Sequence, residues 1–183
     1  MKKKGFTLIE LLVVIGVLAV LAAGVVALIN PLEKTRQAND AKIQNDISQL
    51  ATAMNSFAAQ QNDGVYPCET SAAACTQNPA QSGFAAIGPA GSQELSVVPQ
   101  PPAGSTYTYR STPVSARAVT NYITFANLLS QKYASQCTAA LGGTTPYFFF
   151  SSTIGRACIA CGAAGGYATY AAATAALPAC DFL

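Results

Sequence analysis

The sequence has no histidine and no tryptophan, and charged residues make up only 10% of its 183 positions. Without histidine, the commonest general base of enzymes is missing, and so are histidine-based zinc sites and Ser-His or Cys-His nucleophile pairs. Ten Lys and Arg residues against eight Asp and Glu residues give no strong positive field for nucleic acid. We therefore expect no enzyme, no cofactor, no metal site and no specific nucleic-acid partner.

One long apolar segment dominates the N-terminal part of the chain. Residues 6–29 contain a single ionisable side chain, Glu10. As a helix the segment rises roughly 36 Å at about 1.5 Å per residue, enough to cross a hydrocarbon core of about 30 Å. Because Lys2, Lys3 and Lys4 precede it, that end is expected to stay in the cytoplasm and the C-terminal part to be exported.

Two common export signals fit this segment less well. The apolar region of a secretory signal is about 7–15 residues long and ends at an A-x-A-like site, and no strict A-x-A occurs between Leu18 and Asn30. A lipoprotein signal ends in a cysteine, whereas the first cysteine here is Cys68. A plain uncleaved anchor leaves Glu10 unexplained, because an acidic group at the centre of a bilayer costs roughly 2.5–3.5 kcal/mol.

The residues around Glu10 resemble a known processing signal. The run Lys2-Lys3-Lys4-Gly5-Phe6-Thr7-Leu8-Ile9-Glu10 is similar to the type III leader and cleavage site of type IV pilins and related pseudopilins. The resemblance implies cleavage between Gly5 and Phe6 by a prepilin peptidase, with N-methylation of the new terminal Phe6. It also implies that Glu10 neutralises the terminal amine of a neighbouring subunit. The amine of the same chain is the rival partner, because Phe6 and Glu10 stand at helical spacing i, i+4.

This resemblance predicts a structural subunit of a type IV pilus-like extracellular filament. The expected partners are further copies of the chain in a helical filament, the prepilin peptidase and the pilus assembly machinery. Before assembly the chain is expected in the cytoplasmic membrane as a single-pass protein with its C-terminal part outside, and afterwards in a pilus at the cell surface. A major pilin is favoured, and a minor pilin and a type II secretion pseudopilin are the alternatives.

The composition predicts four segments. They are a leader peptide over residues 1–5, a hydrophobic membrane and assembly helix over 6–29, an amphipathic helix over 30–61 and a globular head over 62–183. Pro31 removes a backbone donor, so we expect a kink or local melting near residues 27–31.

The amphipathic helix carries an apolar seam at alternating steps of four and three residues. The seam consists of Ile43, Ile47, Leu50, Met54 and Phe57. We expect a sheet of the same chain to cover it, because a coiled coil needs the pattern over three or more heptads.

The head sequence predicts a small antiparallel sheet. Residues 65–105 are rich in Pro, Ala, Gly and Ser, which argues against regular strands there. Strand-like composition then appears at residues 106–109, within 118–129, and at 146–151, 157–159 and 166–170. No helical crossover is long enough to join these as parallel strands, so we predict an α+β fold whose four or five antiparallel strands lie on the seam.

All six cysteines follow the apolar segment, on the predicted exported side, where disulfides are the leading interpretation. They are Cys68, Cys75, Cys137, Cys158, Cys161 and Cys180. We favour a Cys68–Cys75 pair because the loop between them is short. Cys180 is then expected to tie the C-terminal tail to Cys137, Cys158 or Cys161.

The run Cys158-Ile159-Ala160-Cys161 opens a different class of function, a membrane-anchored thiol or metal-binding protein. A thioredoxin-type pair usually opens a helix, which the glycine-rich sequence after Cys161 does not predict. A zinc site with four cysteines typically uses a second Cys-x-x-Cys, which is missing. Structural disulfides are therefore preferred. A third possibility is a monomeric anchored binding module in which Glu10 pairs internally.

Overall fold

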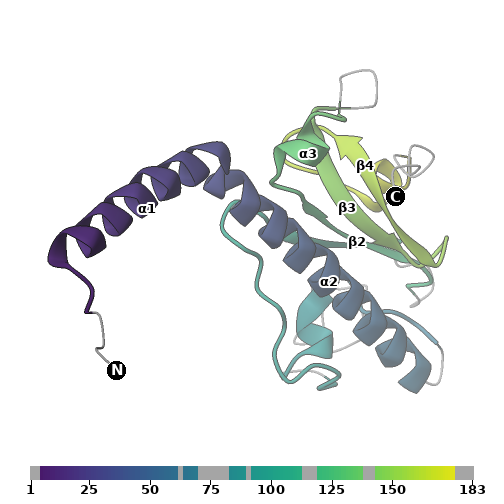
Figure 1. The fold of residues 1–183 in the computed structure, drawn as a ribbon. Coiled ribbons are helices and arrows are strands. Elements are labelled where there is room, and N and C mark those ends of the chain that lie inside the picture. Colours follow the sequence, from purple (N-terminus) through teal and green to yellow (C-terminus); the bar gives the residue numbers. More distant parts are fainter. Residues whose placement is uncertain are drawn as a thin grey trace. The chain divides into compact units, whose positions relative to one another are not determined.

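The computed structural model describes residues 5–61, 64–69, 83–89, 92–112, 119–137 and 143–175. The chain divides into two compact units, Met1–Arg36 and Gln37–Leu183. Its elements (Figure 1) are α1 (Leu8–Leu28), α2 (Pro31–Gln60), the 3-10 helix η2 (Gly83–Ile87), β1 (Tyr107–Ser111), β2 (Tyr122–Asn127), α3 (Gln131–Ala134), β3 (Thr145–Ser151), β4 (Arg156–Gly162) and α4 (Tyr170–Ala175).

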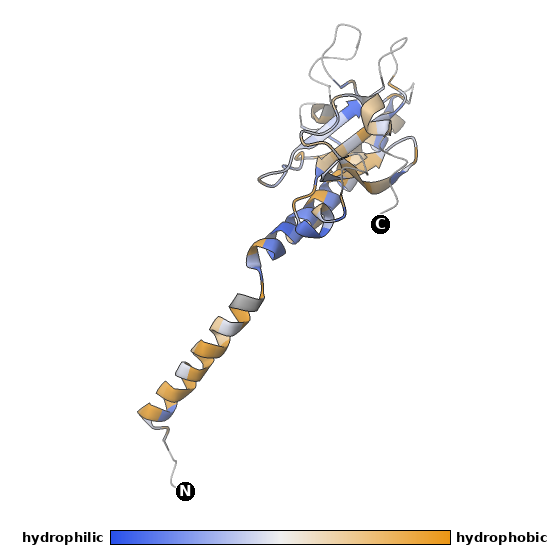
Figure 2. Ribbon diagram, turned by 90° about the horizontal axis from the view of Figure 1, so that it is seen from above, coloured by the Kyte–Doolittle hydropathy of each residue, from blue (hydrophilic) through white to orange (hydrophobic). Residues whose placement is uncertain are grey.

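Helix α1 is apolar along nearly its whole length (Figure 2). Residues Leu8–Val26 have a mean hydropathy of 2.8 and are long and apolar enough to cross a membrane. None of this stretch is buried inside the protein. Because a helix that is hydrophobic all round is stable only when something covers it, α1 requires a lipid or protein environment.

The helical conformation is interrupted between α1 and α2, as the sequence predicts for residues 27–31. Ile29 caps α1 in an extended conformation, with φ −94° and ψ 115°. Pro31 then begins α2 at the first helical position, where its missing N–H breaks no hydrogen bond. The side-chain oxygen of Asn30 accepts a hydrogen bond from the Glu33 amide at 3.3 Å. Asn30 thus starts a new helix as its N-cap.

Four antiparallel strands form the sheet in the order β1-β2-β3-β4. Tyr109 pairs with Thr124 between β1 and β2, and Phe125 with Phe149 between β2 and β3. Phe149 also pairs with Cys158 of β4. Every strand lies beside its neighbour in the chain, which confirms the predicted antiparallel sheet of the α+β fold.

The predicted strand at residues 166–170 is wrong. Gly165 and Gly166 have φ values of 98° and 81°, which take the backbone out of the extended region. Helix α4 then begins at Tyr170. The aromatic and Thr-rich composition of this segment suits a strand, but the turn at the two glycines ends the sheet at β4.

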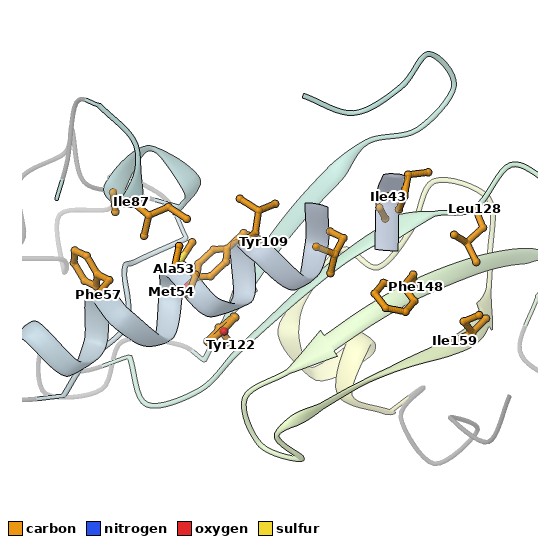
Figure 3. Packing of buried hydrophobic residues seen from close by; sticks show 14 residues of the cluster. Ile43, Ala53, Met54, Phe57, Ile87, Tyr109, Tyr122, Leu128, Phe148 and Ile159 are labelled. Atoms are coloured by element: carbon orange, nitrogen blue, oxygen red, sulfur yellow. The ribbon is translucent and has the colours of Figure 1, made fainter. Parts of the chain in front are cut away.

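The seam of α2 forms the centre of the core, as predicted (Figure 3). Ile43, Ile47, Leu50 and Met54 are fully buried, and Phe57 is 1% exposed. They share one cluster with residues of the sheet and of η2, among them Tyr122, Phe148, Ile159 and Ile87. A second cluster lies on the opposite face of the sheet and includes Phe125, Tyr147, Phe149 and Ala173 of α4.

Two aspartates of α2 also tie the helix to the sheet side of the head. Asp46 accepts hydrogen bonds from the Tyr107 hydroxyl and the Lys42 ammonium, both at 2.5 Å. Burial, followed by the hydrogen bond and the negative charge of Asp46, raises the pKa of Tyr107 well above its usual range. Asp40 is 1% exposed and accepts from the backbone amides of Leu129 and Ser130, at 2.6 and 3.0 Å.

Substitution of Asp40 by alanine is expected to destabilise the head strongly. The buried amide of Ser130 and the partly buried amide of Leu129 would lose their partner, and loss of a partner at a buried group costs about 1–3 kcal/mol. Chemical unfolding of the full chain in detergent, followed by tyrosine circular dichroism, measures the effect. Asn45→Ala on the outer face of the same helix serves as the control and should shift stability by no more than about 0.5 kcal/mol. Equal stabilities of the two variants would contradict the structural role of Asp40.

Candidate functional site

The peptide bond between Gly5 and Phe6 lies in an exposed stretch just before α1. Phe6 is 81% exposed. A Cβ added to Gly5 would meet no atom within 4 Å, so packing within the described chain does not require a glycine there. The bond is accessible to a protease, and a requirement for glycine at this position would come from that enzyme.

Thr7 is the N-cap of α1 and contacts Glu10 in the first turn. Thr7 has an extended backbone, with φ −81° and ψ 149°, and its hydroxyl oxygen accepts from the Glu10 amide at 3.3 Å. The same hydroxyl donates to the Glu10 carboxylate at 3.5 Å. A carboxylate in the first turn also interacts favourably with the helix dipole. Glu10 therefore has a local role in the helix start, in addition to the assembly role that the sequence predicts.

The sequence signal for this capping contact is the spacing Thr7-x-x-Glu10, which the expectation of an amine partner for Glu10 did not include. The capping contact leaves the carboxylate exposed. Among the residues that the structure describes, Glu10 takes part in no ion pair. A charged partner therefore has access to it.

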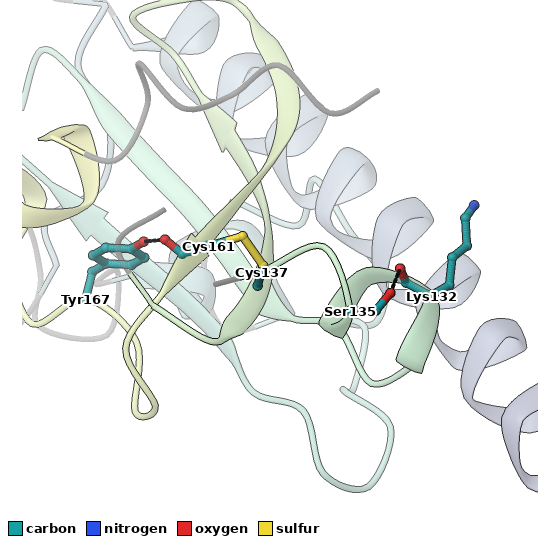
Figure 4. Close-up of a disulfide and its surroundings, with 5 residues drawn as sticks. All are labelled: Lys132, Ser135, Cys137, Cys161 and Tyr167. Atoms are coloured by element: carbon teal, nitrogen blue, oxygen red, sulfur yellow. Dashed lines mark hydrogen bonds between the residues drawn. A yellow bond between two sulfur atoms is a disulfide. The ribbon is translucent and has the colours of Figure 1, made fainter. Parts of the chain in front are cut away.

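The disulfide framework of the head is confirmed for Cys137 and Cys161, which are bonded to each other with their Cα atoms 5.4 Å apart (Figure 4). This bond ties the segment after α3 to strand β4. The Tyr167 hydroxyl donates to the carbonyl oxygen of Cys161 at 3.0 Å. Cys137 and Cys161, two of the three partners predicted for Cys180, are thus bonded to each other.

Cys68 and Cys158 are also disulfide-bonded. The predicted partner of Cys68, Cys75, lies outside the described residues, and so does Cys180. Both Cys68 and Cys158 are buried, at 7% and 3% exposure.

Cys158 and Cys161 do not form the redox pair that their spacing allows. They stand three residues apart on β4, so their side chains point to opposite faces of the strand. Cys158 packs in the cluster with Phe125 and Phe149, whereas Cys161 bonds to Cys137. Among the described residues no three His, Cys, Asp or Glu side chains gather in a group that could hold a metal ion. Both cysteines of the Cys-x-x-Cys run are thus engaged in disulfides, and Cys161 pairs outside the run.

Loss of the Thr7 hydroxyl is expected to loosen the first turn of α1. Removing an N-cap costs typically about 1 kcal/mol, so in Thr7→Val the amide of Glu10 should exchange with solvent roughly fivefold faster. Thr7→Ser keeps the hydroxyl and should exchange like the unaltered chain. Hydrogen exchange by NMR on the full chain in detergent gives both rates. Unchanged exchange in Thr7→Val would mean that the Thr7 hydroxyl contributes nothing to the helix start.

The N-terminal residues of the chain match one known sequence signature. Residues 1–26 match the family model described as the prokaryotic N-terminal methylation motif. No curated protein matches the chain, and no solved structure matches it. The matched residues include Gly5, Phe6, Thr7 and Glu10, together with most of the apolar helix. The chain thus carries the type IV pilin and pseudopilin signature at its N-terminus, which supports a type IV pilin-like or pseudopilin protein.

Proposed function

We propose that this chain is a structural subunit of a type IV pilus-like extracellular filament. The observation that carries the proposal is helix α1, which is apolar all round, unburied within the protein and headed by an exposed carboxylate directly after a processing motif. A simple membrane anchor explains the apolar surface but leaves the Glu10 carboxylate with the local contact to Thr7 alone. A subunit that leaves the bilayer to pack among identical helices explains both.

Processing prepares the helix for this transfer. Cleavage between Gly5 and Phe6 by a prepilin peptidase removes Lys2, Lys3 and Lys4 and creates an α-amine at Phe6. The lysines hold the helix end at the cytoplasmic surface. Their loss leaves the positive α-amine of Phe6 close to the negative carboxylate of Glu10. Two such charges can be desolvated together when they pair.

Assembly then pairs the charges between subunits. The Glu10 carboxylate, exposed at the first turn of α1, neutralises the Phe6 amine of a neighbouring subunit as the apolar helices pack in the filament. Helices that are out of register bury an unpaired charge, which is costly in an apolar surrounding. The charge pair therefore sets the register, and the apolar surface supplies the attraction.

Two locations follow from this function. Before assembly the chain is a single-pass protein of the cytoplasmic membrane with its head outside, and after assembly it is part of a pilus at the cell surface. Within this class we favour a major pilin over a secretion pseudopilin, because the head at residues 62–183 is large and shows no acidic cluster suited to calcium among its described residues.

Glu10→Gln is expected to abolish filament assembly while membrane insertion and cleavage persist. The amide keeps the shape of the side chain and removes the charge that neutralises the amine. Electron microscopy and the amount of chain in sheared surface material measure assembly, and the mass of the membrane-bound chain reports cleavage.

Glu33→Gln provides the matched control, because Glu33 occupies the same third position after an N-cap, in α2 instead of α1. It should leave assembly at the unaltered level. Abundant filaments from cells that carry only Glu10→Gln would overturn the proposed assembly role of this carboxylate.

A further inference from the structure

The bond between Cys137 and Cys161 closes a loop of chain that contains another cysteine (Figure 4). Cys158 lies inside this loop and is itself disulfide-bonded. Its partner is neither Cys137 nor Cys161, because those two are bonded to each other. The remaining cysteines of the chain are Cys68, Cys75 and Cys180. All three lie outside the loop, so the Cys158 bond crosses the Cys137–Cys161 bond in sequence order, whichever of them it uses.

Chain length alone does not select Cys161 as the partner of Cys137. The entropy of loop closure changes only slowly with loop length, and Cys158 is three residues nearer to Cys137 than Cys161 is. In an unfolded chain the two bonds therefore cost nearly the same entropy. A chain that is exported behind its N-terminal helix also presents Cys158 before Cys161. An unfolded head should thus form a Cys137–Cys158 bond as readily as the native bond.

A bond between Cys158 and Cys161 is a second wrong product. Only two residues separate these cysteines, and a Cys-x-x-Cys run is the spacing at which exchangeable disulfides are common. In the folded strand their side chains point to opposite faces, so the native head does not contain this bond. Both wrong bonds occupy Cys158, which the native head bonds to a cysteine outside the loop.

The folded strand β4 is what distinguishes the two cysteines. Cys158 packs in the second cluster with Phe125 and Phe149, whereas Ile159 is buried in the main cluster with the seam of α2. Cys161 comes two residues after Ile159 and lies on the same face. Bringing Cys158 to the place of Cys161 would shift the strand by three residues, and an odd shift turns every side chain to the other face. Ile159 would then leave the core.

The native bonds and the wrong bonds therefore differ in access. Cys137, Cys158 and Cys161 are all buried in the folded head, and a thiolate must reach a sulfur atom to attack a disulfide. A Cys137–Cys158 bond keeps β4 out of its register, so the head stays open and this bond stays accessible. A catalyst of disulfide exchange would rearrange the wrong bonds and leave the native ones intact.

We propose that the head is a substrate of a thiol–disulfide isomerase, a protein with a reduced dithiol, on the exported side of the membrane. The isomerase acts on the unfolded head and allows Cys161 to replace Cys158 as the partner of Cys137. This inference rests on the exported position of the head in the proposed function, and it does not depend on filament assembly.

The rearrangement conserves the number of disulfides. Apart from the expected bond between the first two cysteines, a head paired in sequence order carries Cys137–Cys158 and Cys161–Cys180. The isomerase thiolate attacks the Cys158 sulfur, forms a mixed disulfide and releases the Cys137 thiolate. That thiolate attacks the Cys161 sulfur, forms the native bond and releases the Cys180 thiolate. The Cys180 thiolate attacks Cys158 in the mixed disulfide and releases the isomerase thiolate. Each step breaks one S–S bond and forms one, so no oxidant is consumed.

The test follows oxidative refolding of the full chain in detergent. The reduced, denatured chain is mixed with a purified disulfide oxidase, with or without a purified isomerase in its reduced form, and samples are quenched in acid. Mass spectrometry with fragmentation between Cys158 and Cys161 identifies the partner of Cys137 at each time. We expect Cys137–Cys158 first. The native bond should form roughly tenfold faster with the isomerase, because uncatalysed disulfide rearrangement takes minutes to hours.

The double variant Cys158→Ala/Cys180→Ala tests whether the crossing is the cause. It leaves Cys161 as the only partner for Cys137 within the loop, so the native bond should form equally fast with and without the isomerase. The matched control Cys68→Ala/Cys75→Ala also removes two cysteines but keeps the crossing, and it should still depend on the isomerase. Tyrosine circular dichroism reports whether each variant folds.

Three results would overturn the proposal. The first is equal rates of native bond formation in the unaltered chain with and without the isomerase, and the second is Cys161 as the partner of Cys137 from the earliest sample. Neither depends on the folding of a variant. The third is a Cys158→Ala/Cys180→Ala chain that folds and still needs the isomerase. Because purified chain is used, these results are independent of whether the chain assembles into filaments.

Discussion

The apolar surface of α1 must be covered, and the rest of the structure depends on this constraint. This helix exposes large side chains on every side, from Leu8 at 83% to Val26 at 68%, and each square ångström left in water costs about 25 cal/mol. A bilayer can cover the helix, and so can copies of the same helix. The two environments differ in how they accommodate Glu10. Its charge is energetically unfavourable in lipid, whereas a neighbouring amine can form a specific ion pair with it.

The described part of the head, by contrast, buries its main apolar seam within the same chain. The sheet buries the seam of α2. Asp40 binds backbone amides after β2, and Asp46 binds the Tyr107 hydroxyl of β1. The Cys137–Cys161 bond joins the segment after α3 to β4. The break at Ile29 and the new N-cap at Asn30 separate α1 from α2 along the chain. Helix α1 stays apolar and unburied within the protein, whereas α2 organises the core of the head.

Sequence reasoning succeeded where a local pattern determines the outcome. The seam from Ile43 to Phe57 has a clear helical period, and Pro31 acts within one turn, so both were predictable. It failed at residues 166–170, where the turn at Gly165 and Gly166 ends the sheet. The partner of Cys161 stayed open, because the sequence alone does not show which distant segment lies beside β4.

The most direct measurement is the intact mass and N-terminal sequence of the chain in material sheared from the surface of its native cells. We predict a chain that starts at Phe6, is heavier by one methyl group and has no titratable thiol. Recovery of the chain only in the membrane fraction, with Gly5 and the residues before it still attached, would contradict it. That result would leave α1 as a permanent anchor and Glu10 as a helix cap alone.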